Sequence, residues 1–234
     1  MNIPPIVPAL LPLSPAAPRP RLSSDNRRRQ LLSHAIALFS KRGFSGTRTK
    51  DIAAACGVSE AILFRHFSTK EDLYHAILDT HEAAAGEDEW IAEMRVIAER
   101  RDDLEFIRCM LAQILKSFRE DTAFHRLLLY AGLEGHSLPG MFHERMSSSK
   151  LGFLRKYVMV RQREGAFRKG DPDTQLMLLA SPALQYASRK YIFGLEAFPQ
   201  TDKEAVDEFS ELLLAAMHPS RTPKRTIKRK TSHS

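Results

Sequence analysis

The chain has 234 residues, of which 43% are hydrophobic and 27% are charged, and its formal net charge is +7. This length allows one or two globular domains, and the absence of an 18-residue apolar run gives no reason to expect a membrane-spanning helix. Two cysteines, Cys56 and Cys109, are too few for a disulfide framework; we expect reduced, buried thiols in a cytoplasmic protein, with a redox-sensing pair as the alternative.

The two ends of the chain differ in composition from the rest. Residues 1–22 are apolar but carry seven prolines, and no lysine or arginine precedes Arg19, so they lack the charged start of a signal peptide. Residues 219–234 contain six lysines and arginines and no apolar periodicity. We expect a disordered Pro-rich extension at the first end and a disordered basic tail at the other.

The first expected helix covers about residues 26–42. Its apolar residues recur at intervals of three and four, which is typical of one buried helix face. Residues 23–25 (Ser-Ser-Asp) are good N-cap candidates, and Gly43 is placed to end the helix in a left-handed conformation. The apolar residues of this stripe are Leu31, Leu32, Ala35, Ile36, Leu38 and Phe39.

A helix-turn-helix pattern follows. Thr47 is expected to cap a short helix over about 48–55, Gly57 to form the turn, and Ser59 to cap a second short helix over about 60–66. The second helix presents Glu60, Ala61, Arg65 and His66 on the face opposite Leu63. Ser68 and Glu71 have the spacing of a capping box for a fourth helix over about 70–83.

These motifs together resemble the DNA-binding domain of the TetR/AcrR family of transcriptional regulators. The similarity extends without a gap over about residues 27–78. Its matching pieces are Ala37-Leu38-Phe39, Arg42-Gly43-Phe44, Thr47, Asp51-Ile52-Ala53, Gly57-Val58-Ser59, Leu63-Phe64-Arg65-His66-Phe67 and Lys70-Glu71-Asp72-Leu73.

The resemblance implies that the helix over 60–66 enters the major groove of DNA. Arg65 is then the best candidate for reading a guanine, with His66 as a weaker one, and Lys70 is placed to bind phosphate. Thr47 and Arg48 lie where the family contacts the DNA backbone. The full set of expected DNA-binding residues is Thr47, Arg48, Thr49, Ser59, Glu60, Ala61, Ile62, Phe64, Arg65, His66 and Lys70.

The sequence departs from the family at three positions of the recognition helix. Ala61, Ile62 and Phe64 stand where glycine, a hydroxyl residue and tyrosine are frequent, which removes two hydroxyl groups that could reach phosphate. Glu60 adds a negative charge that either accepts from cytosine N4 or lowers the affinity for DNA. As alternatives, Thr47, Ser59 and Ser68 are plain caps, Ile62 and Phe64 are packing residues, and Glu60 is a solvated acid.

The charge is distributed unevenly along the chain. Residues 23–75 carry nine basic and five acidic side chains, whereas residues 76–218 have a net charge of −5. A basic N-terminal domain on an acidic body is typical of a protein with one DNA-facing surface. The basic tail either adds sequence-independent affinity for DNA or is simply solvated.

Residues 76–218 read as helices throughout, which predicts an all-α protein: a three-helix DNA-binding domain over 23–75 and a larger helical effector-binding and dimerisation domain over 76–218. Pro182 is expected to kink or divide its helix. The expected helices cover about 88–99, 103–119, 121–134, 138–164, 172–192 and 202–217.

The family resemblance implies a homodimer that binds paired DNA half-sites through a four-helix bundle. The bundle maps to residues 172–192 and 202–217, with Leu176, Leu179, Ala180, Leu184, Ala187, Tyr191, Phe209, Leu212, Leu213 and Ala216 at the interface. An effector pocket is expected within residues 103–164. Its candidate lining is Phe106, Met110, Ile114, Phe124, Leu128, Met141, Phe142, Met146 and Tyr157, although such residues at helical spacing are also typical of a core.

No metal site or cofactor is expected, because Leu138-Pro139-Gly140 interrupts any helix that could place His136 and His143 together. The sequence shows no motif of an enzyme. We therefore expect a DNA-binding regulator, a repressor that a small apolar ligand releases from a palindromic operator. A regulator without an effector and an activator are the alternatives.

Overall fold

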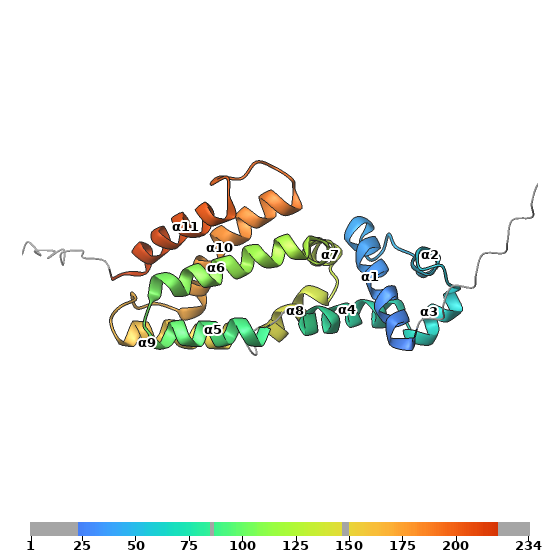
Figure 1. Ribbon diagram of the computed structural model, residues 1–234, viewed down its shortest axis with the longest axis horizontal. Coiled ribbons are helices and arrows are strands. Elements are labelled where there is room, and N and C mark those ends of the chain that lie inside the picture. Colours follow the sequence, from blue (N-terminus) through green and yellow to red (C-terminus); the bar gives the residue numbers. More distant parts are fainter. Residues whose placement is uncertain (1–22, 85–86, 147–149, 220–234) are drawn as a thin grey trace, which may run out of the picture.

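The computed structural model describes residues 23–84, 87–146 and 150–219, and every regular element in these ranges is a helix (Figure 1). The expected terminal extension and most of the basic tail lie outside the described residues. The elements are α1 (Ser24–Arg42), α2 (Thr49–Ala55), α3 (Glu60–His66), α4 (Lys70–Ala84), α5 (Glu87–Glu99), α6 (Asp103–Glu120), α7 (Thr122–Leu133), α8 (Leu138–Met146), α9 (Gly152–Arg163), α10 (Pro172–Ala187), the π-helix η2 (Ser188–Ile192) and α11 (Asp202–Met217).

The molecule is elongated, with a head formed by α1–α3 at one end and a body formed by α5–α11 at the other (Figure 1). Helix α4 leaves the head and runs along the body towards α8, while α7 packs against α1. Within the body, α6 lies between α10 and α11 on one side and α5 on the other. These neighbours bury the apolar face of α6 along most of its length.

The described residues form two hydrophobic cores. One lies in the body, between α6, α9, α10 and α11. The other fills the head and continues into the body, because Phe124, Leu127 and Ala131 of α7 and Leu138 of α8 pack with the side chains of α1–α4. The core of the head therefore does not end at residue 75, and α7 is held to the head by apolar packing.

Several local expectations are wrong in detail. Thr47 does not cap α2: its side chain is fully buried and its hydroxyl donates to the carbonyl of Gly43, 2.8 Å away, while Arg48 is the N-cap residue. The capping box of α4 is formed by Thr69 and Asp72, whose side chains each accept from the other's backbone N–H, one residue beyond the predicted pair.

The helix boundaries of the body also differ from the prediction. Residues 138–164 contain two described helices, α8 and α9, and residues 147–149 between them lie outside the described part of the chain. Pro182 does not divide α10, which is one α-helix from Pro172 to Ala187 and continues as η2. Pro172 at the first helical position and Asp171, whose side chain accepts from the N–H of Thr174, begin α10.

Candidate DNA-binding face and effector cavity

Helix α3 is amphipathic and turns its polar face outwards. Leu63 is fully buried and Phe67, directly after the helix, is 3% exposed, because both pack into the core of the head. Opposite them, Ala61, Phe64 and Arg65 are exposed. Phe64 is 44% exposed, so it is not a core residue, and an apolar ring is available on the outer face of α3.

The start of α3 is joined to α2 by a side-chain contact. The hydroxyl of Thr49 donates a hydrogen bond to the carboxylate of Glu60. Glu60 is thus not simply a solvated acid, because it fixes the second helix of the motif against the third. Ser59 occupies the N-cap position of α3, but its side chain makes no capping hydrogen bond.

Two expected phosphate ligands of the head lie elsewhere than predicted. Thr47 is buried, so its side chain cannot contact DNA in this conformation. The ammonium group of Lys70 turns inwards: it donates to the carbonyl oxygen of Phe44 and lies 4.0 Å from the centroid of the Phe44 ring. Burial lowers the pKa of Lys70, an effect that Glu71 and Glu134 oppose.

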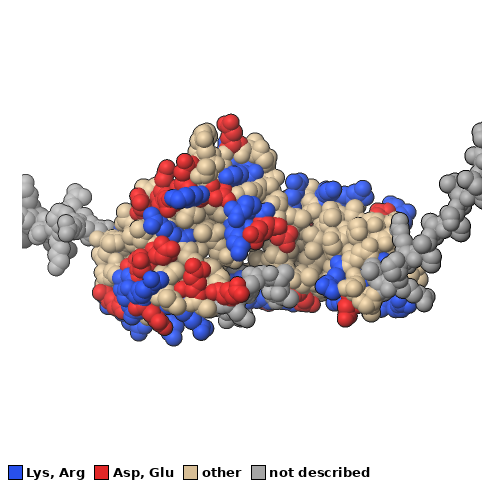
Figure 2. Space-filling view, viewed as in Figure 1, with Lys and Arg blue, Asp and Glu red and all other residues tan. Residues whose placement is uncertain are grey.

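On the face seen in Figure 2, lysine and arginine side chains lie along the upper and lower edges of the head, and the body carries mixed charges. At the start of α1, the guanidinium of Arg28 lies 4.5 Å from the centroid of the Phe67 ring, next to α3. His66 lies in this cationic surrounding, and burial together with Arg65, Arg28 and Arg27 lowers its pKa.

A cavity of about 540 Å³ lies in the body between α4, α6, α9 and α10. Of the residues expected to line it, Met110, Ile114 and Phe142 do so. Phe124, Leu128 and Met141 pack with the core of the head instead, and the side chain of Met146 is outside the described residues. The further lining residues are His81, Trp90, Gln113, Lys116, Ser117, Phe118, Glu120, Asp121, His125, Lys150, Leu151, Leu154, Leu176, Ala180 and Leu184.

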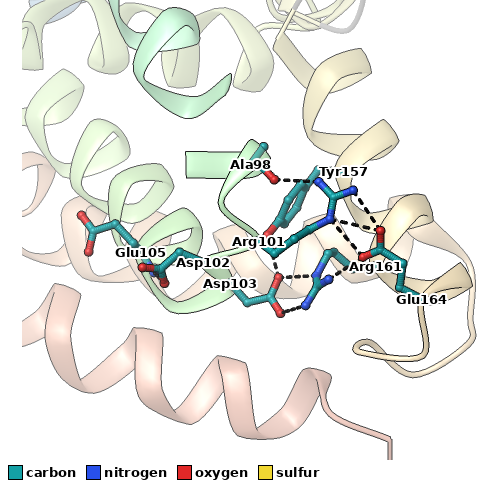
Figure 3. A network of polar contacts seen from close by, with 8 residues as sticks. All are labelled: Ala98, Arg101, Asp102, Asp103, Glu105, Tyr157, Arg161 and Glu164. Atoms are coloured by element: carbon teal, nitrogen blue, oxygen red, sulfur yellow. Dashed lines mark hydrogen bonds and ion pairs between the residues drawn. The ribbon is translucent and has the colours of Figure 1, made fainter. Parts of the chain in front are cut away.

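Phe106 and Tyr157 were also expected in the cavity, and both belong to the core at the far end of the body. Their rings stack with centroids 3.8 Å apart. The Tyr157 hydroxyl donates to Asp103 at 2.6 Å, and Arg161 binds both oxygens of the same carboxylate at 2.7 Å (Figure 3). Because the Tyr157 hydroxyl is bonded to Asp103 and its ring stacks on Phe106, neither group faces the cavity. The prediction from helical periodicity that Tyr157 lines the cavity is therefore wrong.

The polar groups of the cavity gather where α6 ends and α7 begins. His81 of α4 pairs through Nδ1 with Asp121, 3.2 Å away, and its ring stacks on Phe124 with centroids 3.6 Å apart. His125 Nε2 lies 2.9 Å from the hydroxyl of Ser117. Burial and the nearby His81 lower the pKa of His125 to about 4, so that it is neutral at neutral pH.

The predicted dimer face is only partly exposed. Leu176, Leu179, Ala187 and Leu213 are buried within the chain's own core, and Tyr191 donates its hydroxyl to Asp202. Leu176, Ala180 and Leu184 line the cavity. The exposed apolar residues of α10 and α11 are Met177, Leu178, Leu184 and Leu212, with Ala216 on the same exposed side of α11 as Leu212.

Among the described residues, no three His, Cys, Asp or Glu side chains are close enough together to hold a metal ion. His136 instead packs its ring against Phe44 and Tyr74, with centroids 4.7 and 4.6 Å away. In the same ranges of the chain, no helix is both long and apolar enough to cross a bilayer.

Comparison with known proteins gives a consistent result. Residues 31–77 match the family model of bacterial regulatory proteins of the tetR family. The nucleoid occlusion factor SlmA of Vibrio atlanticus is 32% identical over 198 residues, which cover 82% of this chain and 95% of that protein. The transcriptional repressor NicS of Pseudomonas putida is 25% identical over 188 residues, covering 78% and 86% of the two chains.

The fold is also found among solved structures. The crystal structure of AibR in complex with isovaleryl coenzyme A and operator DNA aligns with a TM-score of 0.63 at 22% identity, covering 80% of this chain and 98% of that one. The match of the helix-turn-helix head to the family model and the similarity to SlmA over 82% of this chain lead to the same family. The chain therefore belongs to the TetR family of DNA-binding transcriptional regulators.

Proposed function

We propose that the protein is a dimeric transcriptional repressor that binds a palindromic operator through α3 and leaves it when a small molecule fills the cavity of the body. One observation carries this proposal: α4 begins directly after α3 and, further along, places His81 in the cavity wall. Occupation of the cavity is thus connected to the position of the recognition helix by a single helix of 15 residues.

The exposed face of α3 supports sequence-specific binding. Arg65 has the planar group that matches the O6 and N7 atoms of guanine, and Ala61 and Phe64 offer apolar contact to a thymine methyl group. Arg48 and Ser59 lie at the helix starts next to this face, where side chains reach the phosphates. The hydroxyl of Thr49, at the start of α2, donates to Glu60 instead. Lys70 joins them only if its ammonium leaves the carbonyl of Phe44.

Dimerisation would use the exposed apolar residues of α10 and α11. Met177, Leu178 and Leu212 are 67%, 47% and 69% exposed, which is unusual for large apolar side chains that recur on neighbouring helices. A two-fold dimer through this face would cover them and present two heads to two half-sites. The interface therefore differs from the predicted one by excluding Leu176, Leu179, Ala187 and Leu213.

The cavity favours an effector that is mostly apolar with one polar end. Its α9 and α10 walls are formed by Leu151, Leu154, Leu176, Ala180 and Leu184, whereas Ser117, Asp121 and His125 provide hydrogen-bonding groups at the junction of α6 and α7. A volume of about 540 Å³ is in the range of drug-sized ligand sites.

The proposal is tested by filling the cavity. Ala180→Phe adds a ring to its wall, and Ala92→Phe adds the same ring at an exposed position of α5 outside the cavity lining as a control. The fluorescent probe 1-anilinonaphthalene-8-sulfonate should bind the wild type and the control and bind Ala180→Phe at least about tenfold more weakly. Compounds that displace the probe should release the wild type from DNA but not Ala180→Phe. If these compounds released the wild type and Ala180→Phe from DNA to the same extent, the cavity would not be the effector site.

A DNA-binding protein without a small-molecule effector is the second candidate, which the similarity to the nucleoid occlusion factor favours. In that case Ala180→Phe should change neither the affinity of the protein for DNA nor the control of its target genes in the cell. Under either candidate, the position of the operator relative to the promoter decides whether the protein represses or activates transcription.

A further inference from the structure

Glu134, directly after α7, is the feature from which a further role can be derived. Its carboxylate accepts hydrogen bonds from the backbone N–H groups of Phe44 and Ser45, at 2.9 and 3.3 Å, across about ninety residues of sequence. These two N–H groups belong to the turn between α1 and α2, so a residue of the body holds the turn that positions the helix-turn-helix.

The turn is shaped for this carboxylate. Gly43 has a φ of +71°, which a residue with a side chain rarely adopts, and a Cβ atom at this position would overlap with the Glu134 carboxylate. Next to it, Tyr130 of α7 donates its hydroxyl to the carbonyl of Lys41 at 3.4 Å. The last turn of α1 and the turn that follows it therefore both contact the end of α7.

Aromatic packing and a lysine complete the junction. The rings of Phe44, Tyr74 and His136 lie within 4.6 to 4.8 Å of each other between centroids. Lys70 donates to the carbonyl of Phe44, the residue whose N–H Glu134 binds. The turn is thus held from both sides, by α7 and by the start of α4.

The other end of α7 lies at the cavity. Asp121, the N-cap residue of α7, pairs with His81, and both line the cavity. Helix α7 has 12 residues, which makes it a rod of about 18 Å. This rigid helix connects the polar end of the cavity to the turn between α1 and α2, and α4 forms a second connection between body and head.

We propose that Glu134, together with the apolar packing of α7 on the head, fixes the orientation of the DNA-reading head on the body, so that α7 transmits a change in the cavity to the head as a second lever beside α4. Glu134 is a positioning residue, because it contacts the head from the side of the body and belongs to neither the exposed face of α3 nor the cavity lining. The consequence for DNA rests on the proposed function; the orientation of the head does not.

The orientation is measured within one chain by electron-electron distance spectroscopy. Spin labels are attached at Lys50→Cys on α2 and Arg95→Cys on α5, both exposed positions, in a background with Cys56→Ala and Cys109→Ala. Labelled protein is diluted with unlabelled protein, so that distances between two copies do not contribute. Circular dichroism and thermal melting verify that each variant is folded.

Wild type and the control Glu99→Ala should give one narrow distance distribution. Glu134→Ala should broaden it, and Glu134→Gln, which keeps an accepting oxygen, should restore most of the wild-type distribution. An unchanged distribution in folded Glu134→Ala would overturn the proposal. This result does not depend on whether the protein binds an operator, so failure of the proposed function would be recognised separately.

The second measurement uses the palindrome that the wild type selects from random DNA, and a single half-site cut from it. A head that is folded but loosely oriented lowers the effective concentration of the second head, so Glu134→Ala should bind the palindrome about tenfold more weakly and the half-site within about twofold of the wild type. Equal losses on both DNAs would show damage to the head itself and would overturn the positioning role.

Discussion

The hydroxyl of Thr49 on α2 donates a hydrogen bond to the carboxylate of Glu60 at the start of α3. An acidic residue next to the proposed DNA-binding face therefore has a partner within the head and links the two helices of the helix-turn-helix. The structure thus gives Glu60 an internal partner, although its charge still stands near the expected path of the DNA backbone.

Glu60→Gln should separate these two effects, because glutamine still accepts from the Thr49 hydroxyl but carries no charge. We expect the affinity for DNA of any sequence to rise by about two- to fivefold at low salt, and by less at high salt. Fluorescence anisotropy with Glu99→Gln as the control measures this. A loss confined to one base position would instead mean that Glu60 accepts from a cytosine.

Arg65→Ala should lower the affinity for the selected operator by about 1–3 kcal/mol and relax the preference at one base pair. The reason is that Arg65 is the exposed guanidinium on the outer face of α3. Competition binding with operators substituted at each position gives the profile. If all sequences lose affinity equally, Arg65 contacts only phosphate.

Arg161→Ala should lower the free energy of unfolding by about 3–5 kcal/mol, because it leaves the carboxylate of Asp103 buried without its cation. The side chains of Arg161 and Asp103 are only 13% and 12% exposed. Arg155 pairs with Asp173 at side-chain exposures of 48% and 63%, so Arg155→Ala is the matched control, with an expected loss of at most about 1 kcal/mol. If urea unfolding gave equal losses of unfolding free energy for Arg161→Ala and Arg155→Ala, burial would not be what makes the Arg161–Asp103 pair important.

Acid should destabilise the body before its carboxylates titrate. The pKa of His125 is lowered from 6.5 to about 4, so between these values the unfolded chain binds a proton that the folded chain does not. The contribution of His125 to stability is complete above pH 6.5 and decreases as the pH falls towards 4. Its full size is up to about 3 kcal/mol.

Urea unfolding of the wild type and His125→Gln at pH 7.5, 5.5 and 4.5 measures this loss, with His34→Gln as the control. Although burial raises the pKa of Asp121, hydrogen bonds from His81 and from the N–H of Phe124 hold it below its usual value. Its contribution is lost only at lower pH. A pH dependence that His125→Gln leaves unchanged would exclude His125 as its source.

The sequence predicts most helices and the fold of the head well, because these depend on local patterns. The stripe in α1, the turn at Gly57 and the outward position of Arg65 follow from spacing alone. The buried sites are predicted less well. Periodicity places Leu176 and Leu213 on the apolar faces of their helices. Only the packing of α10 and α11 on α6 decides whether those faces contact the chain's own core or a second copy of the chain.

Residues with a long-range partner could not be predicted at all. The contact of Glu134 with the turn at Phe44 has no local signal, because the two are about ninety residues apart. The inward turn of Lys70 has the same cause, because its partner, the carbonyl of Phe44, lies 26 residues earlier. Thr47 is different: it is buried by a local hydrogen bond to the carbonyl of Gly43, where the sequence pattern suggested a helix cap. His81, Ser117 and His125 enter the cavity from three helices, and polar residues at helix ends normally suggest only caps.

The most direct test of the account is binding of the purified protein to DNA from upstream of its own gene, compared with scrambled DNA of the same composition at two salt concentrations. We predict tighter binding to the upstream DNA at both concentrations, with two chains on each duplex. Equal binding to both DNAs that disappears together at the higher salt concentration would contradict sequence-specific regulation through α3.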